Sequence, residues 1–179
     1  MIKSIEYNLS NIDDKLENDS IVREWLRYMP HIDELLGIKE YQADYDANDP
    51  DSHTCKLDSD FKKIETTLPA GQVLFHRGCW FADDNELVFT RYTSTTLDPN
   101  FARGEPNPRD IYIVIKIMSP DIKFYFFDPN VENGFAEAEV LIENEIKLIR
   151  KCSYKIKKRC NDEYETVFYT EAYRLEAIS

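Results

Sequence analysis

The stretch GFAEAEVLI, residues 134–142, places two glutamates, Glu137 and Glu139, directly before an apolar run that predicts a buried strand. Side chains alternate between the two faces of a strand, so residues two apart point the same way. The two carboxylates would then lie roughly 6–7 Å apart along one face, where they repel each other. Because a cation placed against them relieves that repulsion, the pair predicts a site for a cationic reaction centre and a cationic acceptor.

The same spacing recurs at two later places in this acidic chain. Glu143 and Glu145 lie within the predicted continuation of the strand, and Glu163 and Glu165 lie near the end of the chain. The spacing alone therefore does not choose among the three pairs.

Length and composition favour one domain over residues 1–179. The chain is 42% hydrophobic and 13% aromatic, enough to build a core. The N-terminus lacks the apolar region of a signal peptide, and no stretch reaches the ~20 apolar residues of a membrane-spanning helix. The four cysteines form no CxxC pair and have no histidine at zinc-ligand spacing. We expect a monomeric cytoplasmic protein with reduced thiols, no metal and no membrane partner.

The charge of the chain is strongly negative and unevenly distributed. A net charge of −12 argues against a protein that mainly holds a nucleic-acid backbone. Residues 147–159 are the exception, with seven basic residues and no acidic one. This basic segment is either the solvated face of a hairpin or a docking edge for an acidic partner.

The first part of the chain, residues 1–68, predicts a mainly helical lobe. Three helices are expected: one from a cap at Asp19–Ser20 to Pro30, one over residues 32–36 ending at Gly37, and one capped by Asp60, with a loop over residues 41–60.

Residues 69–179 predict a β-rich core, because apolar residues there recur with period two or in short runs. Ile113, Ile115 and Ile117 alternate with Tyr112 and Val114, which predicts a strand with one fully buried face. The predicted strands cover residues 72–76, 86–93, 111–118, 122–127, 139–149, 154–158 and 165–173. Helices followed by strands indicate an α+β fold.

Three polar motifs lie at the ends of these strands: Phe75-His76-Arg77-Gly78, Ser94-Thr95-Thr96 and Glu137-Ala138-Glu139. Their order resembles the arginine–serine–glutamate class of mono-ADP-ribosyltransferases, which includes arginine-specific bacterial toxins and phage transferases. The resemblance runs from about residue 60 to residue 173. His76 stands where an aromatic residue is usual, and Thr96 replaces a serine.

The resemblance implies a fold, a substrate and an activity. The fold would be an N-terminal helical lobe packed on two crossed small sheets, with an NAD cleft between them. The enzyme would move ADP-ribose from NAD to an arginine of a target protein without a metal. The family's glutamate pair is followed by a further hairpin, which selects Glu137 and Glu139, and the preceding loop resembles the family's substrate-recognition turn with Phe135 as its exposed aromatic.

The resemblance also assigns roles. Glu139 would hold the ribose and face the positive charge that develops on it, and Glu137 would orient the acceptor guanidinium and take its proton. Arg77 would bind the diphosphate of NAD, and Ser94 would bind near the nicotinamide ribose and help to fix Glu139.

The remaining cofactor contacts that the resemblance implies are Gly78, Thr95, Phe101 and Arg109. For Phe101 and Arg109, core packing or loop solvation is an equal alternative. Two other functions also remain open: an NAD glycohydrolase that uses the same site, and a non-catalytic module that binds a partner through the basic segment.

Overall fold

The computed structural model describes residues 20–44, 52–78, 85–103, 111–128, 138–157 and 163–175. Three predicted site residues, Arg109, Phe135 and Glu137, lie outside these ranges. The helices are α2 (Ser20–Tyr28), the 3-10 helix η1 (Ile32–Glu34), α3 (Leu36–Asp44), α4 (Thr54–Lys63) and α5 (Pro99–Arg103). The strands are β1 (Val73–Arg77), β2 (Glu86–Phe89), β3 (Thr93–Thr96), β4 (Ile111–Ile117), β5 (Phe124–Phe126), β6 (Glu139–Ile142), β7 (Ile146–Lys157) and β8 (Tyr164–Arg174).

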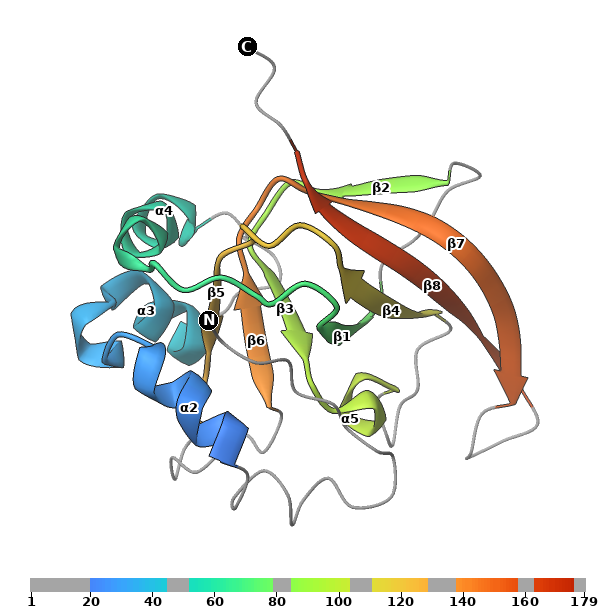
Figure 1. The fold of residues 1–179 in the computed structure, drawn as a ribbon, viewed down its shortest axis with the longest axis horizontal. Coiled ribbons are helices and arrows are strands. Elements are labelled where there is room, and N and C mark those ends of the chain that lie inside the picture. The colour runs from blue at the N-terminus through green and yellow to red at the C-terminus, as the bar shows by residue number, and fades with distance from the viewer. Residues whose placement is uncertain are drawn as a thin grey trace.

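The eight strands form one mixed sheet in the order β2-β7-β8-β4-β1-β3-β6-β5. Only the β4–β8 pair is parallel among the described strands. The prediction of two separate sheets is corrected here, because β1 and β3 pair through Phe75 and Thr96 and so join the two halves. That pair is the only one recorded between β1 and β3, whereas β1 and β4 share five. In Figure 1, β5 and β6 run at a steep angle to β4.

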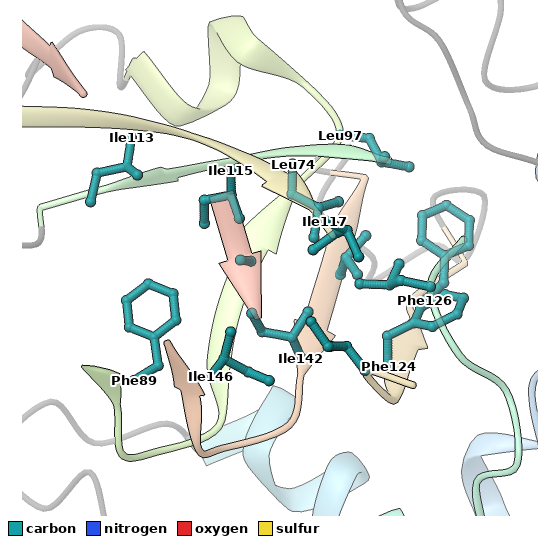
Figure 2. Close-up of a cluster of buried hydrophobic side chains, with 14 of the residues drawn as sticks. Leu74, Phe89, Leu97, Ile113, Ile115, Ile117, Phe124, Phe126, Ile142 and Ile146 are labelled. Atoms are coloured by element: carbon teal, nitrogen blue, oxygen red, sulfur yellow. The ribbon is translucent and has the colours of Figure 1, made fainter. Parts of the chain in front are cut away.

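The main hydrophobic core lies between the two halves of this sheet. Leu74 of β1 and Ile115 of β4 meet Ile142 of β6 and Phe124 of β5 in one buried cluster (Figure 2). Alternate residues of β4 face the other way, where Tyr112 and the residues around it form a smaller cluster under α5. The alternation predicted for β4 is therefore confirmed.

Helix α2 forms as predicted and packs on β5. Its apolar residues recur at helical spacing, and Trp25 is fully buried with its ring 4.8 Å from that of Phe124 and 5.6 Å from that of Phe126. Proline at position 30 cannot continue a helix, and α2 ends two residues before it. No helix in the described part of the chain is long and apolar enough to cross a membrane.

Helices α3 and α4 contradict the predicted loop over residues 41–60. Helix α3 runs through Gly37 instead of ending there, and α4 begins at Thr54, six residues before the predicted cap. Asp60 does cap a helix, but the helix is α3: its buried carboxylate accepts hydrogen bonds from the backbone N–H groups of Gly37 (2.6 Å) and Ile38 (3.1 Å). The carboxylate thus satisfies donors at the start of α3 that have no partner within the helix.

Gly37 lets α3 and α4 approach each other closely. A Cβ atom at Gly37 would lie 2.5 Å from the backbone carbon of Lys56 in α4. We predict that Gly37→Ala lowers the free energy of unfolding by about 1–3 kcal/mol, because the clash is with backbone and cannot be relieved by a rotamer change. Urea denaturation measures this, with Gln42→Ala on the exposed part of α3 as the control. A gain of stability, which alanine normally brings inside a helix, would contradict this close packing.

The predicted strands over residues 86–93 and 139–149 are each broken in two. Residues 90–92 separate β2 from β3, and residues 143–145 separate β6 from β7, where Glu145 has a left-handed backbone with φ 61°. Strand β7 then continues to Lys157 and includes residues 154–157 of the segment predicted separately as 154–158. Turns at these positions let the chain pass from one half of the sheet to the other.

The basic segment forms most of β7, in a hairpin with β8. Lys147 pairs with Glu86 at 2.7 Å and Lys151 with Glu171 at 3.2 Å, while the Arg150 guanidinium donates to the Asn85 side chain. Part of its charge is therefore neutralised within the molecule. Residues 158 and 159 lie outside the described ranges.

Candidate active site

Arg77, Ser94 and Glu139 come from three strands that are adjacent in the sheet. Arg77 is the last residue of β1, Ser94 lies in β3, and Glu139 is the first residue of β6. Thr96 links them, because it is opposite Phe75 of β1 on one side and opposite Glu139 of β6 on the other. Neighbouring strands are about 4.8 Å apart, so the three residues start from one small region of the sheet.

The three residues also share one face of the sheet. Thr95 and Val140 are paired and face the main core, so their neighbours Ser94 and Glu139 face the opposite side. On β1, Leu74 faces the main core while Phe75 packs in the cluster under α5, which places Arg77 on the face of Phe75. Paired residues lie on the same face. Phe75 pairs with Thr96, and Thr96 pairs with Glu139, so this face is continuous from Arg77 to Glu139.

Arg77 is held against an aromatic ring. Its guanidinium carbon lies 5.4 Å from the centre of the Phe101 ring, which α5 carries, within the range of a cation–π contact. The structure thus brings Phe101 to Arg77, and the cofactor contact of Phe101 stays a prediction. Gly78 follows with φ 86°, a conformation that favours glycine, and its N–H donates to the carbonyl of Ile111 at 3.2 Å.

Thr95 is not part of this face. Its side chain is buried, and its hydroxyl donates to the carbonyl of Val140 at 2.7 Å, which fastens β3 to β6. The side chain of Thr95 therefore supports the sheet from the core side and points away from the face of Ser94 and Glu139.

The backbone around Glu139 is fixed on both sides. The carbonyl of Glu139 accepts a hydrogen bond from the N–H of Phe127 at 3.1 Å, and the carbonyl of Ala138 accepts one from the N–H of Leu97 at 3.1 Å. Ala138 is buried with φ 45°, a left-handed conformation that costs an alanine about 1–2 kcal/mol. Strain of this kind in a non-glycine residue is characteristic of functional sites.

The conformation of Ala138 also corrects the argument that placed Glu137. Strand β6 begins at Glu139, and Ala138 is not extended, so the alternation of a strand does not reach back across it. Glu137 itself lies outside the described residues.

The other two glutamate pairs lie elsewhere. Glu143 is buried and accepts a hydrogen bond from the N–H of Lys123 at 2.7 Å; burial raises its pKa, and this bond and Arg174 oppose that effect. Glu145 is exposed in the turn after β6. Glu165 is buried in β8, which is separated from β3 by β4 and β1. Neither of these pairs consists of two strand residues on the face that carries Ser94 and Glu139.

The helical lobe contacts the strand that carries Ser94. The Tyr92 hydroxyl donates to the carboxylate of Asp58 in α4 at 2.7 Å, and its ring lies 4.6 Å from that of Phe61. Burial, followed by the bond to Asp58, raises the pKa of Tyr92 well above its usual range. Sequence reasoning missed this contact, because a tyrosine at the end of the predicted strand 86–93 and an aspartate in the predicted loop 41–60 carry no signal that they meet.

A cavity of about 920 Å³ lies between the end of α2, the segment after α4 and the turn at Pro120. None of the three residues of the candidate site lines it. The part of the chain that the structure describes contains no group of three or more His, Cys, Asp or Glu side chains that could hold a metal ion.

Comparison with solved structures identifies the architecture. C3larvin toxin, an ADP-ribosyltransferase from Paenibacillus larvae, superposes with a TM-score of 0.58 at 12% identity, over 92% of this chain and 100% of that one. C3stau2 from S. aureus, solved with NAD, gives 0.62 at 9% identity, over 97% and 100%. The fold is that of the ADP-ribosylating toxins.

A third structure has the same fold within a longer chain. The ADP-ribosylating toxin BECa of a C. perfringens binary enterotoxin, solved with NADH, has a TM-score of 0.59 at 13% identity, over 96% of this chain and 50% of that one. No family model matches the sequence, and neither does any curated protein. At these identities the likeness is one of fold.

Proposed function

We propose that this chain is a mono-ADP-ribosyltransferase that transfers ADP-ribose from NAD to an arginine side chain of a target protein and releases nicotinamide. The observation that carries the proposal is the placement of Arg77, Ser94 and Glu139 on one face of three adjacent strands. These residues are far apart in the sequence, and they lie on adjacent strands of a fold that resembles that of ADP-ribosylating toxins. A shared fold or a shared motif order would each be weaker support alone.

Arg77 has the chemistry to bind the diphosphate of NAD. A guanidinium offers paired N–H donors that match phosphate oxygens, and its charge does not depend on pH in the physiological range. The Phe101 ring, with its centre 5.4 Å from the guanidinium carbon, limits the freedom of the Arg77 side chain. This arrangement fits a fixed diphosphate contact.

Glu139 has the chemistry to promote departure of nicotinamide. NAD supplies a ribose–nicotinamide bond whose cleavage leaves positive charge on the ribose. A carboxylate that is already in place stabilises this charge without having to reorganise. The backbone of Glu139 is held between β3 and β5 by its pairing with Thr96 and the bond from Phe127, which supports such a fixed position. Ser94, on the same face, would orient the ribose and Glu139 through its hydroxyl.

The acceptor side of the site is assigned to residues outside the described ranges. An arginine guanidinium must lose a proton as it attacks, and Glu137 would orient it and take that proton. Phe135 would contact the target protein, and Arg109 would add a second phosphate contact. A glutamate at position 137 is the reason that we propose arginine as the acceptor.

Arg77→Lys is predicted to weaken NAD binding by about 1.5–3 kcal/mol, the range for a charge-assisted hydrogen bond. Lysine keeps the charge but loses the planar fork and the contact of the guanidinium with Phe101. Calorimetry with NAD measures the change, and Arg91→Lys, at an exposed arginine before β3, is the control. Equal affinity in the wild type and Arg77→Lys would remove Arg77 from the site.

The proposed activity is tested by incubating the protein with a cell lysate and NAD labelled in its adenylate part. Transfer to protein gives labelled protein bands, and Glu139→Gln should give none. Labelled free ADP-ribose without labelled protein would indicate the NAD glycohydrolase instead. Unchanged NAD would favour the non-catalytic module.

A further inference from the structure

The junction between β1 and β3 is the weakest backbone link in the neighbourhood of the candidate site. Phe75 and Thr96 form the only recorded pair across it, whereas β3 and β6 share four. Arg77 lies on one side of this junction and Ser94 on the other. Both residues are proposed to hold NAD. Because the strands share so little backbone pairing, the position of Arg77 relative to Ser94 depends on other contacts between β1 and β3.

The ring of His76 crosses this junction. Its Nδ1 lies 2.8 Å from the carbonyl oxygen of Ser94, and the ring is half-buried with its plane at 66° to that of Phe89, 5.4 Å away. A carbonyl oxygen only accepts hydrogen bonds, so Nδ1 must carry the proton. His76 immediately precedes Arg77 in the chain, so one hydrogen bond ties the strand end that carries Arg77 directly to Ser94.

We propose that His76 is a positioning residue that holds Ser94 at a fixed place relative to Arg77 through an Nδ1–H bond to the Ser94 carbonyl. The consequence that we expect, an effect on NAD binding, rests on the proposed function. The Phe89 contact limits rotation of the ring, and the hydrogen bond replaces the missing backbone pairs. A residue with an aromatic ring alone would keep the packing and lose the tie across the junction.

Three variants separate the hydrogen bond from the packing. His76→Phe keeps a ring against Phe89 and removes the donor, and we expect about fivefold to tenfold weaker NAD binding from the loss of one hydrogen bond. His76→Asn places an amide N–H near the position of Nδ1 and should restore binding to within about twofold of the wild type. His76→Gln carries its amide further out and should behave like His76→Phe. Thermal denaturation of each variant identifies any loss of folding.

Nuclear magnetic resonance of the wild-type histidine ring tests the bond without NAD. In mildly alkaline buffer, where an ordinary imidazole is neutral, long-range proton–nitrogen spectra should show Nδ1 protonated and Nε2 bare. A protonated Nε2 and a bare Nδ1 would overturn the inference, as would equal NAD affinity in His76→Phe and the wild type. If the protein binds no NAD, the proposed function fails, and the ring spectrum still decides whether the tie exists.

Discussion

Replacing Glu139 by glutamine is expected to lower both NAD cleavage and protein labelling by about 10²–10³-fold. Glutamine keeps the size and a hydrogen-bonding oxygen of glutamate, so the change removes little except the negative charge. That charge faces the ribose as it becomes positive, and every productive route passes through that step. The two activities should therefore fall together, measured as nicotinamide release and as label on protein.

Two control variants show whether the effect belongs to Glu139. Glu145→Gln and Glu163→Gln remove the same charge from exposed positions outside the face of Arg77 and Ser94. Both variants should keep wild-type activity. Each changes the net charge by the same amount as Glu139→Gln, so they also control for that change. Wild-type nicotinamide release in folded Glu139→Gln would show that the site lies elsewhere.

Replacing Glu137 by glutamine is expected to lower arginine labelling by about 10²-fold or more while NAD hydrolysis continues. The carboxylate of Glu137 would serve the acceptor alone, because a guanidinium must be oriented and lose a proton. Water is small and needs less orientation, so it can still accept ADP-ribose. The measurement is the ratio of labelled protein to free ADP-ribose, with Glu139→Gln as the variant in which both fall.

Two results would contradict this division of roles. Wild-type arginine labelling by Glu137→Gln would leave Glu137 without a part in the acceptor step. Loss of NAD hydrolysis to the level of Glu139→Gln would mean that the two glutamates act together on NAD instead of on different partners.

The strands were more predictable than the helices, for a physical reason. Alternation along β4 is strong because one face fills the main core and the other packs under α5, so apolar residues are required at fixed positions. Helix α4 buries only Leu57, Asp60 and Phe61, and one of these is an acid. The acidic stretch over residues 41–60, which contains Pro50, therefore predicts a loop. Only the contact with α3 explains why Asp60 is buried and Gly37 lies inside a helix.

The candidate site was predictable in part. Arg77, Ser94 and Glu139 could be found because polar motifs end or begin apolar strands in a recognisable order. The orientation of the Thr95 side chain was within reach of the sequence, since adjacent residues of a strand face opposite sides and Ser94 and Thr95 cannot share one face. The left-handed conformation of Ala138 could not be predicted from the sequence, because alanine has no local preference for it and the surrounding backbone bonds impose it.

His76 and Tyr92 illustrate contacts that depend on tertiary structure alone. In the sequence, His76 is a departure from the aromatic residue usual in the family motif, and nothing there indicates that its ring reaches the Ser94 carbonyl. Tyr92 meets Asp58 only because α4 packs over the start of β3. Both lie within two residues of the predicted site, so their effects belong in any test of it.

The most direct test of the central claim is mass spectrometry of a protein labelled by this chain in the presence of NAD. Fragmentation that preserves side-chain modifications should locate ADP-ribose on the guanidinium of an arginine, and the modification should be absent with Glu139→Gln. ADP-ribose on another residue type, or no modification that depends on Glu139, would contradict the account.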